Sequence, residues 1–271
     1  MPTAVNRCDL PDAQNSKDTR NKRIERVGVQ RVKVPLTIKR KEQDGISEVV
    51  NAEVAMYVSV AADITGSNMS RFNECLMSYT TETISGDCLE KIIKDMLNRL
   101  KSDDGYISIK FNYFLPRFAP VSKTKGMQGY NIEFIGKMVD NKYDFIVKVA
   151  VIGTTLCACS KQISDYGAHN QRNCTTVQLV LNDSLYWVED IIEGIENCMS
   201  CPIFPVLKRE DEKWVTEQAY ENPKFVEDMV RDVAIMLDEH GIEHYHIKSA
   251  ADESIHHHEA VAFLSKDWIL S

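Results

Sequence analysis

The chain has 271 residues, of which 44% are hydrophobic and 27% are charged, and its formal net charge is −8 at pH 7. This composition is that of an ordinary globular protein, and the acidic balance argues against an extended nucleic-acid surface, which needs a basic stripe, while leaving room for a nucleotide ligand. No apolar stretch approaches the roughly 20 residues of a membrane helix, and the first residues hold no apolar signal segment, so we expect a cytoplasmic protein with no membrane partner.

The N-terminal third begins with an arm and continues with strands. Residues 1–26 are polar and lack periodicity, which predicts an irregular arm. From Val27 to Arg40 apolar and polar residues alternate, and a similar pattern runs from Val49 to Val60. We therefore expect two paired strands, joined by a turn at residues 43–45.

The later elements repeat one order. Apolar residues at helical spacing predict helices at 89–100 and 225–237, and shorter helices are expected at 69–77 and 189–197. The other predicted strands span 106–115, 130–139, 143–152, 175–181, 243–248 and 260–264. Strands, paired helices and strands thus occur twice, which predicts an α+β fold with antiparallel sheets and helices on one face. The open sheet edges favour closure into a barrel by oligomerisation.

One short segment, Thr154–Cys174, gathers the most reactive chemistry. It follows an apolar strand that we expect to end at Gly153, and it contains Cys157, Cys159 and His169. Thiolate and imidazole are common ligands of zinc and similar ions. A buried thiol beside a loop histidine, and a nucleophilic Cys-His pair, are the two alternatives. A four-thiol zinc knot with Cys198 and Cys201 is a weaker possibility, because the spacing is unusual.

Three further stretches carry polar groups. Residues 207–217 form a dense charge run, which is commonly a solvated face but also offers carboxylate ligands and the phosphate-binding cations Lys208 and Arg209. Glu227 lies at the border of an apolar helix face. In an extended segment His256 and His258 would point to one side, and two imidazoles suit proton transfer near neutral pH. A polar edge is the alternative for the histidines.

Longer motifs point to a known family. They are RIERVGV at residues 23–29, NMSRF at 68–72, TTLCACSKQISDYGAHNQR at 154–172, LKREDEKWVTEQAYENPKFVEDMVRD at 207–232 and ESIHHHEA at 253–260. With them the chain resembles GTP cyclohydrolase IB, a metal-dependent bacterial enzyme of the tunnelling-fold superfamily. The resemblance implies conversion of GTP and water to formate and 7,8-dihydroneopterin triphosphate, the entry to folate biosynthesis. It also implies tandem tunnelling-fold modules, here residues 27–125 and 126–271, in a homotetramer with active sites between subunits.

The resemblance also implies roles for individual residues. Cys157, His169 and Glu212 match the ligands of a divalent metal, whether Zn, Mn or Fe, and Glu227 matches the carboxylate that anchors the purine ring. His256 and His258 are candidates for acid/base catalysis, with Cys159 in support. By charge and position alone, Lys161, Arg172, Lys208 and Arg209 are candidates for the triphosphate. Two departures from the family are Asn68, where a histidine is common, and His257, where another polar residue is typical. The first puts the role of that side chain in question, and neither affects the proposed metal ligands.

Three rival functions stay open at the level of the sequence. One is an archaeal-type cyclohydrolase that uses iron and yields a cyclic phosphate product. Another is the related nitrile reductase, which requires a nicotinamide cofactor. The third, from a different class, is an oligomeric module that holds a structural zinc and performs no chemistry, in which case metal removal would unfold it.

Overall fold

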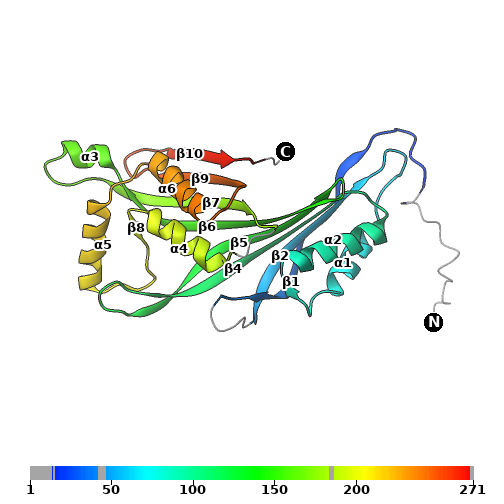
Figure 1. The fold of residues 1–271 in the computed structure, drawn as a ribbon, viewed down its shortest axis with the longest axis horizontal. Coiled ribbons are helices and arrows are strands. Elements are labelled where there is room, and N and C mark those ends of the chain that lie inside the picture. The colour runs from blue at the N-terminus through cyan, green and yellow to red at the C-terminus, as the bar shows by residue number, and fades with distance from the viewer. Residues whose placement is uncertain (1–13, 15, 42–46, 183–185, 269–271) are drawn as a thin grey trace.

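The fold is a ten-stranded sheet that carries helices on one face (Figure 1). The computed structural model describes residues 14, 16–41, 47–182 and 186–268. The predicted turn at 43–45 and most of the predicted arm lie outside these ranges. The strands are β1 (Ile24–Lys39), β2 (Ser47–Val60), β3 (Thr83–Ile84), β4 (Gly105–Phe118), β5 (Lys125–Val139), β6 (Lys142–Leu156), β7 (Asn170–Val180), β8 (Cys201–Pro202), β9 (Tyr245–Asp252) and β10 (Glu259–Lys266). The helices are α1 (Met69–Met77), α2 (Gly86–Leu100), α3 (Ala158–Ile163), α4 (Val188–Cys198), α5 (Arg209–Glu221) and α6 (Val226–Glu239).

The sheet is continuous through both halves of the chain. Its order is β10-β9-β7-β6-β5-β4-β2-β1-β3, with β8 paired to β6, and only the short β1–β3 pair is parallel. Pairing of β5 with β6, in register from Asn131↔Ala150 to Val139↔Lys142, joins the halves. This confirms the predicted α+β class with a large antiparallel sheet. The predicted boundary after residue 125 falls inside the β4–β5 hairpin, whereas the repeat of elements divides at the β5–β6 turn, residues 140–141.

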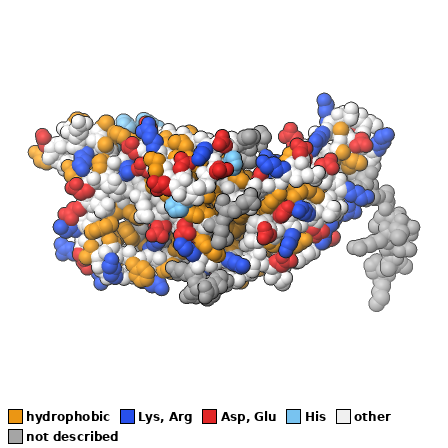
Figure 2. All heavy atoms as spheres, viewed as in Figure 1, with side chains coloured by type: hydrophobic (Ala, Val, Ile, Leu, Met, Phe, Trp, Pro, Cys, Tyr) orange, Lys and Arg blue, Asp and Glu red, His pale blue; other side chains and the backbone are white. Residues whose placement is uncertain are grey.

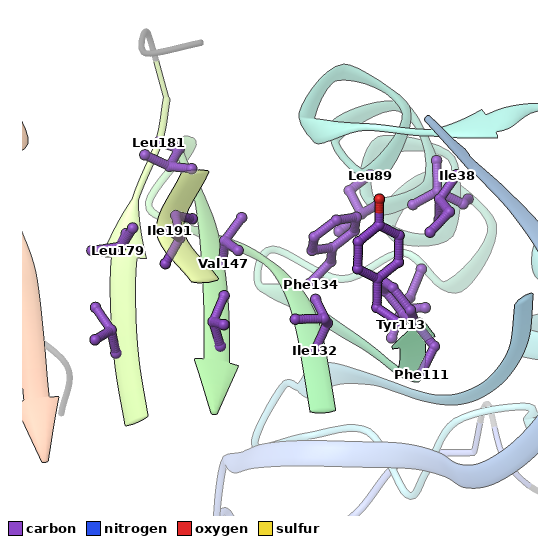
Figure 3. Close-up of a cluster of buried hydrophobic side chains, with 14 of the residues drawn as sticks. Ile38, Leu89, Phe111, Tyr113, Ile132, Phe134, Val147, Leu179, Leu181 and Ile191 are labelled. Carbon is purple, nitrogen blue, oxygen red and sulfur yellow. The ribbon is translucent and has the colours of Figure 1, made fainter. Parts of the chain in front are cut away.

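The helices cover the sheet in two groups. In Figure 1, α1 and α2 lie over the strands of the first half, whereas α4 and α6 lie over those of the second. Most side chains between the helices and the sheet are apolar and buried. Burial of this face is therefore the main favourable contribution to the free energy of folding. Figure 3 shows part of this core, with Leu89 near Phe134 in the first half and Ile191 near Val147 and Leu181 in the second.

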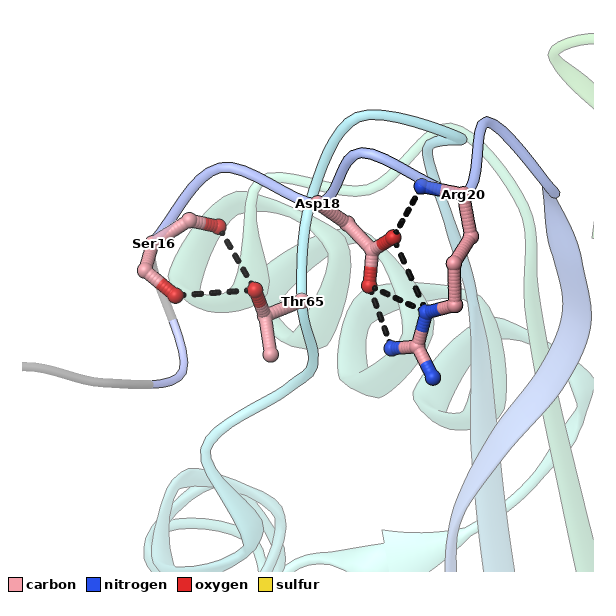
Figure 4. Close-up of polar contacts among 4 residues, drawn as sticks. All are labelled: Ser16, Asp18, Arg20 and Thr65. Carbon is pink, nitrogen blue, oxygen red and sulfur yellow. Dashed lines mark hydrogen bonds and ion pairs between the residues drawn. The ribbon is translucent and has the colours of Figure 1, made fainter.

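Polar contacts hold the segments at the ends of the sheet. The described part of the N-terminal arm lies against the loop after β2, where the Ser16 hydroxyl is 2.8 Å from that of Thr65 and Asp18 is paired with Arg20 (Figure 4). Farther along, Arg117 and Tyr130 of the β4–β5 hairpin both donate to the buried carboxylate of Glu196 on α4. The long hairpin of the first half is therefore fastened to a helix of the second.

The surface mixes charges of both signs. On the face shown in Figure 2, acidic and basic side chains are interspersed over the whole length of the molecule. This distribution agrees with the absence of a basic stripe in the sequence. Among the helices in the described residues, none has the length and apolar content needed to cross a membrane.

Candidate active site

The end of the β6–β7 hairpin brings together the two residues that the sequence singled out first. β6 does not end at Gly153, as expected, but continues to Leu156, because it stays paired with β7 as far as Leu156↔Asn170. Gly153 instead admits Met199, since an added Cβ would lie 2.0 Å from the Met199 sulfur. Just beyond the strand, the backbone N–H of Cys157 donates to the carbonyl of His169 over 3.1 Å. The intervening residues 158–168 therefore form a loop whose two ends meet.

Cys157 is held at the start of the short helix α3. Its sulfur accepts a hydrogen bond from the Ser160 N–H at 3.4 Å, and the Ser160 hydroxyl donates to the Cys157 carbonyl. The same hydroxyl oxygen accepts from the His169 N–H at 3.2 Å. Ser160 thus fixes the backbone of both residues, and the thiol is half-buried instead of free in solvent.

The His169 ring, just before β7, is oriented by Gln171 near the start of that strand. Its Nδ1 lies 2.8 Å from the side-chain oxygen of Gln171 and 3.9 Å from a carboxylate oxygen of Glu253. Because both of these oxygens accept hydrogen bonds, Nδ1 carries the proton and Nε2 keeps its lone pair. The second nitrogen is therefore the one available to a ligand.

These residues line a cavity of about 400 Å³ to which several distant segments contribute. Lys224, just before α6, donates its N–H to the Leu156 carbonyl over 3.0 Å, which brings the first turn of α6 and its exposed Glu227 to the cavity. The complete lining is Thr155, Cys157, His169, Gln171, Lys224, Phe225, Val226, Glu227, Ala251, Glu253, His256, His258, Ala260 and Val261.

The histidine segment adopts a turn, not the extended form that the alternation argument assumed. β10 begins only at Glu259, after bends at residues 256–258. Even so, His256 and His258 lie together, with stacked rings whose centroids are 4.8 Å apart and whose planes differ by 13°. Both line the cavity, whereas His257 is not among the lining residues. The predicted pairing is confirmed, although its cause is the turn.

The predicted metal ligands do not all meet within one chain. Cys157 and His169 share the cavity, but Glu212 lies exposed on the first turn of α5 and does not line it. Among the described residues, no three His, Cys, Asp or Glu side chains come close enough to hold an ion. Convergence of Cys157, His169 and Glu212 therefore stays a prediction for an assembly of several copies, because in one chain α5 contacts the hairpin through its C-terminal end, near Ala219. The Cys157 sulfur and the His169 imidazole remain a suitable pair of metal ligands, but the Glu212 carboxylate of the same chain does not join them.

The predicted triphosphate contacts and the supporting cysteine also lie away from the cavity lining. Lys161 donates to the Tyr220 carbonyl and lies over the Tyr220 ring. Arg172 follows the lining residue Gln171 on β7 and therefore projects from the opposite face of the sheet. Lys208 and Arg209 are at the N-terminal end of α5, and Cys159 is exposed on α3. No anion site is formed by these residues in one chain.

The four-thiol knot is not formed either. Cys201 is buried on β8, and burial raises the pKa of its thiol to about 11. Burial likewise raises the pKa of Cys198 to about 11, so both groups stay protonated at neutral pH. Cys159, by contrast, is exposed. Thiols in such different surroundings do not make a common metal site in this chain.

The charge run at 207–217 contains a buried residue that the pattern did not reveal. Asp211 is fully buried, and its carboxylate accepts hydrogen bonds from the N–H groups of Val121, Ser122 and Lys208 and from the Ser122 hydroxyl, at 2.6–2.9 Å. Burial opposes its ionisation, but these hydrogen bonds outweigh burial and hold the pKa well below its ordinary value. Asp211 thus fastens α5 to the tip of the β4–β5 hairpin.

Four polar lining residues were also missed: Thr155, Gln171, Lys224 and Glu253. Gln171 was within reach of sequence reasoning, because it is two residues after His169 and, in extended chain, residues two apart point to the same side. Glu253 opens the quoted histidine motif. Thr155 and Lys224 carry no signal of their own in the sequence.

Comparisons with known proteins give a consistent result. Residues 10–262 match a family model described as type I GTP cyclohydrolase folE2. The chain is 46% identical over 259 residues to a GTP cyclohydrolase FolE2 of Methylobacillus flagellatus, which covers 95% of this chain and 96% of the relative. It is 45% identical over 260 residues to the same-named protein of Nitrosomonas eutropha, with 95% and 96% covered.

Solved structures share the fold at low identity. The uricase of Arthrobacter globiformis superposes with a TM-score of 0.51 at 9% identity, covering 90% of this chain and 94% of that one. A hyper-thermostable AgUricase mutant gives 0.54 at 7% identity, covering 90% and 92%. These likenesses concern the fold alone.

Proposed function

The chain belongs to the family of type I GTP cyclohydrolases described as folE2, and from this premise we propose how its residues carry out the reaction. It is a GTP cyclohydrolase of the type that releases formate from GTP and serves folate biosynthesis. The relatives are named GTP cyclohydrolase FolE2. The finer assignment to type IB, with 7,8-dihydroneopterin triphosphate as product, is part of the proposal. The observation that carries it is that Cys157, His169, Glu227, His256 and His258, from four distant segments, line one cavity.

Glu227 recognises the guanine ring. A carboxylate can accept two parallel hydrogen bonds, one from N1–H and one from the 2-amino group, which matches the donor edge of guanine. A purine without these donors would leave the carboxylate poorly paired and would bind less well. The position of Glu227 on the first turn of α6, at the cavity, supports this assignment.

His256 and His258 supply protons. When water adds to C8 of guanine, N7 must take up a proton before the imidazole ring opens, and hydrolysis of the resulting formamide needs a second proton transfer. An imidazole can donate and accept a proton, which suits both steps. The stacked pair faces the same cavity as Glu227, so one of these rings can reach the five-membered ring of a guanine bound there.

Cys157 and His169 are the candidates to hold a divalent metal, Zn, Mn or Fe. Their sulfur and nitrogen suit such ions, and the free Nε2 of His169 supports the assignment. Among the described residues of one chain, no third His, Cys, Asp or Glu side chain completes the site. We assign the third ligand to Glu212 contributed by a second copy, which agrees with the exposure of that side chain on α5. When bound, such an ion would supply a Lewis acid that lowers the pKa of water.

A homotetramer with active sites between subunits and tandem tunnelling-fold modules belong to the same proposal. β10 lies at one edge of the sheet, and the short β3 follows β1 at the other. Such edges favour pairing with another copy. Residues 208, 209, 161 and 172 would bind triphosphate only if assembly brings them to the cavity. A cytoplasmic location is supported by the free state of all seven cysteines in the described residues.

The direct test is incubation of the metal-reconstituted protein with GTP. We expect release of formate and the fluorescence of an oxidised pterin. Mass spectrometry of the product excludes the archaeal-type alternative if it detects the triphosphate and no cyclic phosphate. Absence of NADPH oxidation dismisses the nitrile reductase. A protein that releases no formate with any of the three metals would contradict the proposal.

A further inference from the structure

Thr155 is a buried residue whose hydroxyl is not used by the fold. It is the last residue but one of β6, and its side chain is 1% exposed. Its Oγ1 has no hydrogen-bond partner among the residues that the structure describes. Because a buried hydroxyl without a partner destabilises a protein, such a group in a native fold needs a reason.

A second buried threonine, away from the cavity, serves as a comparison for the hydroxyl of Thr155. Thr175 on β7 is 0% exposed, and its hydroxyl donates to the side-chain oxygen of Asn173 at 2.8 Å. Ser249 on β9 belongs to the same network. The interior of the second half can therefore satisfy a threonine hydroxyl. At Thr155 it does not.

The position of Thr155 supplies the reason. It lines the cavity together with Gln171, its direct partner across the β6–β7 register, and it lies two residues before Cys157. The other polar groups on this wall are already engaged, since the Gln171 oxygen binds the His169 ring and the Lys224 ammonium pairs with Asp232. The Thr155 hydroxyl is thus a neutral donor beside the candidate site, and no acceptor for it lies within the described part of the chain.

From this we infer that Thr155 is a further substrate-contacting residue, whose hydroxyl donates to the guanine ring that Glu227 anchors. The inference rests on the proposed function. Once the carboxylate has taken N1–H and the 2-amino group, the heteroatoms left on the base for recognition are O6, N3 and N7, and all three are acceptors. A donor is what the base still requires, and Thr155 is a donor that lacks an acceptor. The contact completes recognition of the base from the side of the sheet.

The test compares three variants in the full chain, with kinetics on GTP and thermal unfolding without substrate. Thr155→Val keeps the shape and removes the hydroxyl. It should raise KM for GTP by about tenfold, the factor expected for one hydrogen bond to a buried ligand, with a kcat near that of the wild type. Its Tm should stay at or above the wild-type value, because no protein hydrogen bond is lost.

Two controls separate binding from folding. Thr155→Ser retains the hydroxyl and should keep KM within about twofold of the wild-type value, since the donor is preserved. Thr175→Val is the same substitution at equal burial where the hydroxyl is bonded, so it should lower Tm and leave KM unchanged.

The contradicting results are equally specific. A Thr155→Val variant with wild-type KM, or one that loses Tm as Thr175→Val does, overturns the inference while leaving the cyclohydrolase assignment intact. A wild-type protein that releases no formate from GTP contradicts the proposed function itself, and the inference with it.

Discussion

The two halves of the molecule share an order of elements but differ in what they bury. In the first half the face beneath α1 and α2 is lined by residues such as Val54, Met56 and Ile107, all fully buried and apolar. The first half also buries the hydroxyls of Ser59, Ser67 and Ser108, but the second half buries more polar groups and includes charged ones, most of them on β6, β7 and α4 and near the start of α5. They are Thr155, Gln171, Asn173, Thr175, Glu196, Ser200, Asp211 and Ser249.

This difference separates scaffold from site. An apolar interior needs only complementary packing, whereas each buried polar group must find a partner or serve a ligand. The polar groups of the second half that lie away from the cavity are paired, as at Thr175 and Asp211. Thr155, at the cavity, is not. Duplicated architecture therefore lets one half stabilise the sheet while the other accommodates chemistry.

The largest effect is expected at the strand end of the second half. His169→Ala should reduce formate release from GTP by at least about 1,000-fold, because it removes a group that the proposed chemistry requires. The oligomeric state, measured by light scattering, should equal that of the wild type. His240→Ala, an exposed histidine on the C-terminal side of α6, is the matched control and should keep wild-type turnover. If His169→Ala kept its turnover, the claim that the second half carries the active site would be contradicted.

A core substitution in the first half should act on stability alone. Ile92 on α2 is fully buried, and Ile92→Ala leaves a cavity that should cost about 2–5 kcal/mol of unfolding free energy. Below the unfolding transition kcat/KM should equal that of the wild type. Urea unfolding and GTP kinetics measure the two quantities. A fall in kcat/KM of the folded variant would show that the halves are not separable.

Glu227→Gln tests recognition without changing the fold. The amide cannot accept from both N1–H and the 2-amino group, so kcat/KM for GTP should fall by about 100-fold, as for the loss of charge-assisted hydrogen bonds. Because Glu227 is exposed in the single chain, Tm should not change. Glu239→Gln, at the other end of α6, is the control. If Glu227→Gln and Glu239→Gln had equal kcat/KM for GTP, Glu227 would not be the residue that binds the guanine base.

Asp211 should show a smaller, pH-dependent effect. Its pKa is lower in the folded chain than the ordinary 3.8, so the stability it contributes is fully present above that value and is lost as pH falls through the folded pKa. Asp211→Asn should lower Tm by several degrees at pH 7, and the difference from the wild type should shrink below pH ~4. Glu210→Gln, exposed one residue away, should leave Tm unchanged. A difference that is constant with pH would mean that the charge is not involved.

The sequence was informative where periodicity is strong. Helix α2 follows from the spacing of Leu89, Ile92 and Met96, and α6 from a similar stripe, because in both cases one face packs on the sheet. The meeting of Cys157 and His169 was foreseeable from a hairpin that ends beside them. His256 and His258 were correctly expected to lie on one side, although a turn and not an extended segment brings them together.

The rest depended on contacts between distant segments. α5 escaped detection because few of its side chains are buried, and one of those is the charged Asp211, which looks like part of a solvated run. Glu212 was assigned to the site by resemblance, yet the direction of α5 keeps it from the cavity of its own chain. The unpaired hydroxyl of Thr155 cannot be inferred without knowing its surroundings. Burial and pairing of polar groups are properties of the assembled fold.

The most direct measurement is a crystal structure of the protein with a GTP analogue that resists ring opening. The account predicts the base in the cavity at the end of β6 and β7, with its donor edge on the Glu227 carboxylate and the Thr155 hydroxyl within hydrogen-bond distance of a ring acceptor. Density for the base at another place, for example in the cleft lined by Phe134 and Phe145 between the two helix groups, would contradict it.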